Sequence, residues 1–164
     1  RDDKTPLFKE LESTLLQQRI NEENATDAYS QYLEGYEEVA SLKIAGAFHD
    51  INESAKTDRL HLFGATADDP PVYFYRTIDN VRFSYDGKRK SYTPWQKMNV
   101  QIPVRDISPV IHNGRLLIFW VQITTTPANK VENGESRFVG YQHRFSFQYS
   151  EKRANGTWTH RKNF

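Results

Sequence analysis

The five histidines have the widest chemical range in this sequence, since imidazole can ligate metals and transfer protons. They are His49, His61, His112, His143 and His160. No two of them stand four residues apart, and no His-Glu-x-x-His motif occurs. His49-Asp50 lies at a predicted strand end and offers one arm of a metal site, but no second ligand follows at a suitable spacing. We therefore predict no metal site.

Motifs for nucleophiles and for cofactors are also missing from the sequence. There is no Gly-x-Ser-x-Gly elbow, no phosphate-binding glycine loop and no dinucleotide fingerprint, and there is no cysteine. A catalytic pair of carboxylates is defined by the distance between the two groups in space, so the sequence alone does not exclude one. Aspartates near strand ends more often form turns. Such aspartates are Asp50, Asp58, Asp79, Asp86 and Asp106. We predict no catalytic residues and no cofactor.

Residues 150–158 partly match the aspartate box of sialidases, Ser-x-Asp-x-Gly-x-Thr-Trp. The aspartate is missing, and Gly156 directly precedes Thr157 without the intervening residue. Even a complete box stabilises a hairpin and performs no catalysis. Sialidase centres are assembled by blades all around a propeller, and at about 40–45 residues per blade this chain can supply only two or three. We therefore predict that the chain is not an enzyme.

The charge of the chain is balanced overall and divided along its length. A net charge of +1 from 22 bases and 21 acids does not suggest a nucleic-acid partner. Residues 1–42 carry ten acids and four bases, whereas residues 43–164 carry eleven acids and eighteen bases. The longest apolar run, 116–121, is too short to cross a membrane. The division is typical of helices that tolerate glutamate followed by strands and loops that carry lysine and arginine. The alternative is that two differently built segments attract each other.

The acidic segment has the pattern of two helices. Thr5-Pro6 provides an N-cap hydroxyl followed by proline at the first helical position. The apolar stripe that follows consists of Leu7, Leu11, Leu15 and Leu16. After a break at 21–24, a second helix is predicted over about 25–42. Its expected apolar face consists of Tyr29, Tyr32, Leu33, Tyr36, Val39 and Ala40. We predict a helical hairpin over residues 1–44.

The remaining residues, 45–164, have the pattern of an antiparallel β domain. Predicted strands are 44–51, 59–63, 72–77, 109–112, 115–123 and 141–149. Asp86-Gly87 and Asn113-Gly114 are typical hairpin turns. The fold class is therefore α+β and mainly β, with the helical hairpin followed by a β-sandwich or a partial propeller-like sheet.

Three details of the β domain can be checked against coordinates. The continuous apolar run 116–121 is typical of a strand that is buried on both faces. The polar segment 124–135, which contains Pro127 and Asn133-Gly134, is predicted to be a loop. The segment 141–149 alternates, so that its odd-numbered residues share one face and its even-numbered residues share the other.

Seven segments in collinear order carry a resemblance to a known family. They are 15–21 (LLQQRIN), 32–42 (YLEGYEEVASL), 47–50 (AFHD), 72–79 (VYFYRTID), 95–98 (WQKM), 109–111 (PVI) and 114–120 (GRLLIFW). Together they resemble the neuraminidase-like region in the A component of bacterial insecticidal toxin complexes, the Tc toxins. The resemblance covers about residues 10–125 and loses detail after Thr126.

The resemblance implies a fragment of a large pore-forming and translocating subunit, secreted or on the bacterial surface. Such subunits form a bell-shaped homopentamer with a shell around a central channel. The neuraminidase-like region lies at the base of this shell, where protomer contacts enclose the channel tip until a pH change loosens them. The family's name reflects its fold, and it has no catalytic residues to transfer. Ser108 stands where arginine is expected before Pro109-Val110, so no interface role is transferred for that arginine.

The sequence and the resemblance together give two functional hypotheses. The first is a shell segment whose partners are other protomers and whose contacts depend on pH. Exposed ion pairs are each worth at most about 1 kcal/mol, so only a repeated set could act as a lock. The residues expected to form it are Glu34, Glu37, Glu38, Lys88, Arg89 and Lys90. The alternative is a glycan-binding β module that recognises host glycans or a receptor, with Tyr75 and Trp120 stacking on sugar rings.

Overall fold

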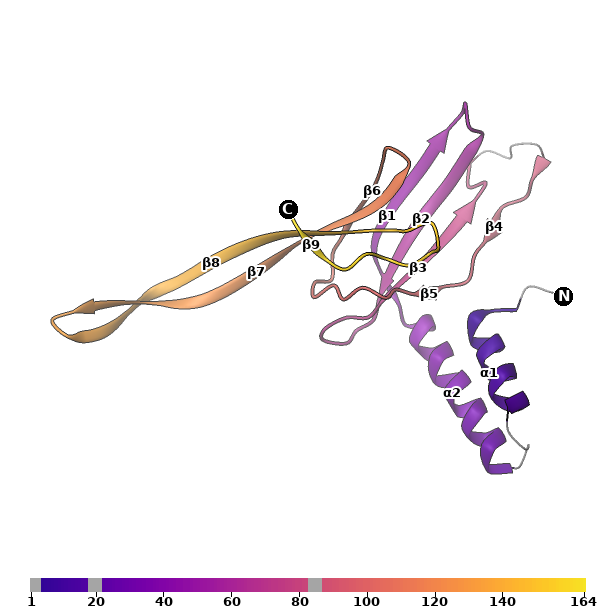
Figure 1. Ribbon diagram of the computed structural model, residues 1–164, viewed down its shortest axis with the longest axis horizontal. Helices are drawn as coiled ribbons and strands as arrows, with labels where there is room; N and C mark the ends of the chain where they lie inside the picture. The colour runs from indigo at the N-terminus through magenta and orange to yellow at the C-terminus, as the bar shows by residue number, and fades with distance from the viewer. Residues whose placement is uncertain (1–3, 18–21, 83–86) are drawn as a thin grey trace.

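The computed structural model describes residues 4–17, 22–82 and 87–164. Two helices, α1 (Pro6–Gln17) and α2 (Glu22–Ala40), lie side by side and precede two antiparallel sheets (Figure 1). The predicted class, α+β and mainly β with an initial helical hairpin, is confirmed. Thr5 is the N-cap of α1, since its Oγ1 accepts a hydrogen bond of 3.2 Å from the Phe8 N–H.

The second helix starts earlier and ends earlier than predicted. It begins at Glu22 rather than near residue 25, because acidic residues are favoured in a first helical turn. Of the predicted break at 21–24, Asn21 lies outside the described residues, and the prediction is wrong for 22–24, which belong to the helix. The helix ends at Ala40, where the Ser41 hydroxyl donates to the Glu38 carbonyl at 3.1 Å. Leu42 then packs beside Gly64 of the first sheet instead of continuing the helix.

The first sheet continues directly from α2. Its strands are β1 (Lys43–Asn52), β2 (Thr57–Ala65), β3 (Tyr73–Asp79), β4 (Ser91–Tyr92) and β5 (Gln96–Lys97). The order is β1-β2-β3-β4, and β5 also pairs with β3. The three long strands coincide with the predicted segments to within a few residues. Of the predicted Asp86-Gly87 turn, Asp86 lies outside the described residues, and Gly87 has a φ of 69°.

The second sheet contains β6 (Ser108–His112), β7 (Arg115–Glu132), β8 (Glu135–Glu151) and β9 (Lys162–Asn163), paired in that order. The predicted Asn113-Gly114 turn joins β6 to β7, with φ values of 49° and 72°. Asparagine and glycine tolerate this left-handed backbone region better than other residues do, which is why the pair is typical of tight hairpins.

The prediction of a loop over 124–135 is wrong, because β7 continues to Glu132 and turns at Asn133-Gly134. Threonines 124–126 are β-branched and suit a strand. Pro127 is tolerated because this part of β7 is an edge strand, which needs no backbone N–H on its outer side. The pairing of β7 with β6 stops at Phe119, and the pairing of β8 with β9 involves only Gln148 and Tyr149. We call the two-stranded part, residues 121–147, the arm; it extends far from the two sheets (Figure 1).

The hydrophobic core lies between the two sheets. Phe63 and Tyr73 of the first sheet and Ile118 of the second are almost completely buried, as is Ile102 of the connection between the sheets. The prediction that the run 116–121 is buried on both faces is wrong. Only its even-numbered residues enter the core, and Val121 is 40% exposed. The second sheet has the core on one side and no described element covering the other.

The two sheets approach closely at Gly46. A Cβ added there would lie 2.9 Å from the carbonyl oxygen of Ile107 and 3.1 Å from Cδ of Pro109. The Ile107 N–H also donates to the Ala45 carbonyl at 3.2 Å, so this backbone cannot retreat without losing a hydrogen bond. Glycine at position 46 therefore lets the connection before β6 pack against β1.

We expect Gly46→Ala to lower the free energy of unfolding by about 1–3 kcal/mol, the usual cost of overpacking. Guanidinium unfolding followed by tryptophan fluorescence measures the change, since Trp120 and Trp158 are buried. Gly35→Ala is the matched control, because its nearest neighbour is the movable end of Leu7 and alanine favours a helix. Equal stability of Gly46→Ala and the parent chain would show that the contact is loose.

Candidate functional site

An open cavity of about 520 Å³ lies where the ends of the two sheets meet. It brings together titratable side chains from β1, β2, β3, β7, β8 and the segment that follows β8. These are Asp50, Arg59, His61, Tyr75, Arg115, Glu151, Lys152 and Arg153. Because this set contains acids, bases, a histidine and a tyrosine, it is the place to look for chemistry in the described residues.

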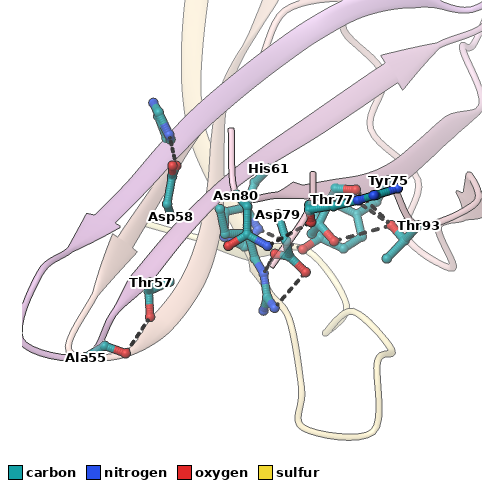
Figure 2. Close-up of polar contacts among 12 residues, drawn as sticks. Ala55, Thr57, Asp58, His61, Tyr75, Thr77, Asp79, Asn80 and Thr93 are labelled. Carbon is teal, nitrogen blue, oxygen red and sulfur yellow. Dashed lines mark hydrogen bonds and ion pairs between the residues drawn. The ribbon is translucent and has the colours of Figure 1, made fainter. Parts of the chain in front are cut away.

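His61 and Tyr75 form the buried polar pair of the cavity. His61 Nδ1 lies 2.7 Å from the Tyr75 hydroxyl, and the two rings are stacked (Figure 2). Burial, assisted by the positive charge of Arg59, lowers the pKa of His61 to about 4. Burial likewise raises the pKa of Tyr75 to about 12. Both groups are therefore neutral at pH 7, and neither is a phenolate nucleophile or a charged acid.

Two of the three arginines that line the cavity, Arg59 and Arg115, lie against carboxylates. Arg59 on β2 pairs in a bidentate manner with Asp79, its cross-strand neighbour on β3 (Figure 2). Arg115 Nε lies 3.6 Å from Glu151. Sialidase chemistry needs free arginines and a tyrosine–glutamate pair, whereas here the Tyr75 hydroxyl bonds to His61. The described cavity thus lacks the arrangement that this reaction requires.

His49, which the sequence offered with Asp50 as one possible arm of a metal site, bonds to a carboxylate of the neighbouring strand instead. Its Nε2 lies 2.6 Å from Oδ1 of Asp58, which is 3% exposed. The other carboxylate oxygen of Asp58 accepts a hydrogen bond of 2.6 Å from the Arg82 N–H. The pair therefore ties β1 and β2 to the segment that follows β3. Nowhere in the described parts of the chain do three His, Asp or Glu side chains gather so that they could hold a metal ion.

The two rings predicted to stack on glycans lie in the core. Tyr75 is 7% exposed and Trp120 is 3% exposed. The Trp120 indole N–H donates to Gln148 Oε1 at 2.9 Å, and the Tyr75 ring packs against Phe63 and Trp158. Neither ring has an open face on which a sugar could stack. Trp120 and Tyr75 are thus corrected from candidate glycan contacts to core residues.

The charged residues predicted to form contacts lie on separate parts of the surface. Glu34 and Glu37 are exposed on α2, and Glu38 Oε1 lies 3.9 Å from Lys97 Nζ. Residues 88–90 are exposed on the segment that leads into β4, away from α2 (Figure 1). A contact between these acids and these bases would therefore join two copies of the chain, and it stays a prediction.

Sequence reasoning missed a large exposed apolar surface on the arm. Five odd-numbered side chains share one face of the ribbon and are 40–67% exposed: Val121, Ile123, Tyr141, Phe145 and Phe147. We call this set the arm face. The alternation within 141–149 is confirmed, but at its end the polar residues Gln148 and Ser150 enter the core. The alternation of apolar and polar residues was the feature of the sequence that could have revealed this surface. It indicates one apolar face, but it does not indicate whether another element covers that face.

Residues 42–164 match the family model of the neuraminidase-like domain, and the chain therefore belongs to that family. Toxin subunit YenA2 of Yersinia entomophaga is 23% identical over 162 residues, which are 95% of this chain and 12% of that protein. The predicted likeness to Tc toxin subunits is thereby confirmed. The chain spans about an eighth of the length of this curated relative.

Two solved structures share the fold over the whole chain. One is TcdA4 of Morganella morganii, with a TM-score of 0.76, 20% identity and coverage of 7% of that chain. The other is TcaA-TcaB of Yersinia pseudotuberculosis, with a TM-score of 0.68, 20% identity and coverage of 8%. Neither described helix of this chain has the length and apolar character needed to span a membrane.

Proposed function

We propose that this chain is a non-catalytic shell segment of a secreted, pore-forming and translocating toxin subunit, and that it contributes to contacts between protomers of a homopentamer. The observation that carries the proposal is the arm, which exposes five large apolar side chains on one face. A soluble domain rarely leaves such a face uncovered. The similarity to toxin subunits of which this chain is a small part supports the same conclusion.

The absence of turnover is part of the proposal. In the cavity at the ends of the sheets, three pairs of polar groups contact each other: His61 with Tyr75, Arg59 with Asp79 and Arg115 with Glu151. His61 Nε2 is buried without a hydrogen-bond partner, and we infer that the three pairs support the fold rather than await a substrate. We also propose that the helical hairpin, predicted as residues 1–44, is a unit separate from the β domain predicted as 45–164, with the boundary moved before Lys43, where β1 begins.

We further propose that closure of the shell depends on pH through the acids of α2 and the bases before β4. Single exposed ion pairs contribute little, so the effect requires the same set repeated around a ring. Reversing the acids with Glu34→Lys, Glu37→Lys and Glu38→Lys places like charges opposite residues 88–90. We expect the full-length assembly carrying these changes to open at neutral pH, as seen by electron microscopy across a pH series.

The matched control restores the attraction with the charges exchanged. Adding Lys88→Glu, Arg89→Glu and Lys90→Glu to the first three changes is expected to return the opening to the parental pH. High salt is expected to weaken closure in both the parent and the exchanged variant, because exposed pairs are screened. An unchanged opening pH in the first variant would refute the electrostatic part of the proposal.

A further inference from the structure

Asparagine is followed by glycine at three turns of the chain: 113–114, 133–134 and 155–156. The pair suits tight turns because both residues tolerate a positive φ. It is also open to deamidation, because glycine has no Cβ that would shield its backbone nitrogen from the preceding side chain. The turns that shape the second sheet are therefore candidate sites of covalent modification.

Deamidation needs no reagent except water. The glycine nitrogen bonds to Cγ of the asparagine and gives up its proton, while the Cγ–Nδ2 bond breaks and the amide nitrogen leaves as ammonia. Water then opens the resulting succinimide ring at one of its two carbonyl groups, which gives aspartate or isoaspartate. Because the nitrogen must reach Cγ, the turn has to distort, and the ease of local opening separates the three sites.

Hydrogen bonds hold both reacting groups of the turn at Asn155-Gly156. Asn155 Oδ1 accepts from the Thr157 N–H at 3.1 Å and from the Thr157 hydroxyl at 2.7 Å. The Gly156 N–H, whose nitrogen would attack, donates to the Arg153 carbonyl at 3.0 Å. Reaction at Asn155 would have to break these bonds close to Trp158, which lies in the core.

The hydrophobic core supports the turn at Asn113-Gly114. Leu116, two residues after this turn, is 7% exposed and belongs to the core, and Ile111 packs against the same core from the other strand. Asn113 Nδ2 also lies 3.2 Å from His112 Nε2. Opening this turn would draw apolar side chains out of the core, which costs free energy.

The turn at Asn133-Gly134 lacks both kinds of support. It lies at the tip of the arm, which only β7 and β8 form (Figure 1). Neither the Asn133 side chain nor the Gly134 N–H makes a hydrogen bond to any described residue. Val131, two residues before the turn, is 70% exposed. A ribbon of two strands opens most easily at such an end.

We propose that Asn133 is a site of spontaneous deamidation, and that in the folded chain it loses its amide faster than Asn113 and Asn155. The reaction involves only water and this turn, so it is independent of the proposed function.

The product carries a new negative charge at a place where acids already meet. Glu132 and Glu135 lie opposite each other beside the turn, and Lys130 and Arg137 form the next pair on that face. Lys130 Nζ is bound to Glu132 at 2.9 Å. Like charges that lie opposite each other destabilise a strand pair, and isoaspartate adds a carbon to the main chain of a two-residue turn. We expect either product to loosen the tip of the arm.

Ageing of the full-length subunit at pH 8 tests the site. The aged protein is digested, and mass spectrometry measures the modified fraction at each asparagine, since the acid is heavier than the amide. We expect this fraction at residue 133 to be at least about fivefold higher than at residue 113 or 155. Equal fractions at the three sites, or a smaller fraction at residue 133, would refute the proposal.

The same incubation in urea separates the effect of the fold from that of the dipeptide. In the unfolded chain the three modified fractions are expected to agree within about twofold. A preference for residue 133 that is equally strong in urea would mean that support of the turns is not its cause, and the proposal would fail.

Asn133→Asp and Asn133→Gly test the consequence for the arm. Both residues suit this turn, but only aspartate supplies the charge. Hydrogen exchange of the amides in 128–138 is expected to be about twofold or more faster in Asn133→Asp and in the aged parent, and close to the parental rate in Asn133→Gly. Parental exchange in all three samples would contradict the loosening of the tip.

Discussion

Replacing Trp158 by alanine is expected to lower the free energy of unfolding by about 3–5 kcal/mol, the usual cost of deleting a buried large aromatic side chain. Trp158 is 3% exposed and packs edge-on against both Phe63 and Tyr75 at centroid distances of 5.7 Å. The loss is comparable with the total stability of a small domain. Guanidinium unfolding monitored by far-ultraviolet circular dichroism measures it without relying on the deleted fluorophore.

The backbone of Trp158 is held as firmly as its ring. Its N–H donates to Asn99 Oδ1 at 2.7 Å, and its carbonyl accepts from Asn99 Nδ2 at 3.0 Å. The truncated side chain therefore leaves a cavity that the chain cannot easily close. Val131→Ala, at a site that is 70% exposed on the arm, is the control and is expected to change stability by less than about 0.5 kcal/mol. Similar effects of the two substitutions would mean that the core between the sheets is not well packed.

The stability of the chain is expected to fall by about 3 kcal/mol through His61 as the pH is lowered from 6.5 to 4. Burial holds the pKa of His61 at about 4 in the folded chain, whereas the ordinary value is 6.5. Between these values the unfolded chain binds a proton that the folded chain does not, so acid favours unfolding. Above pH 6.5 the contribution is fully present, and below pH 4 it is lost.

Unfolding curves at a series of pH values, compared between His61→Gln and His112→Gln, isolate this contribution. His112 is exposed, and its replacement is expected to leave the pH dependence of stability unchanged. His61→Gln is expected to flatten the profile between pH 6.5 and 4 while Tyr75 keeps a side-chain partner. If the free energy of unfolding of His61→Gln falls with pH as steeply as that of the parent chain, other groups cause the acid sensitivity.

The elements whose geometry is local were predictable from the sequence. Thr5-Pro6 marks the start of a helix, and Asn113-Gly114 marks a turn, because each depends on the backbone preferences of two neighbouring residues. The arm was not predictable in this way. Residues 124–135 are polar and contain a proline, and their strand conformation comes from pairing with β8 rather than from their own composition.

The candidate site depends on register, which the sequence did not reveal. His61 meets Tyr75, and His49 meets Asp58, only because β1, β2 and β3 pair with particular offsets. Burial of the aromatic rings was likewise a property of the assembled sheets. Trp120 and Phe145 are both large aromatic residues, yet one lies in the core and the other on an exposed face. Which face of a strand is covered depends on the elements that the fold places beside it.

A cryo-electron microscopy reconstruction of the full-length assembled subunit at neutral pH tests the central claim most directly. We expect this segment to lie in the outer wall of a ring, with side chains of a neighbouring protomer covering the arm face. A ring in which this segment touches no other protomer, or in which its cavity holds a substrate, would contradict the account.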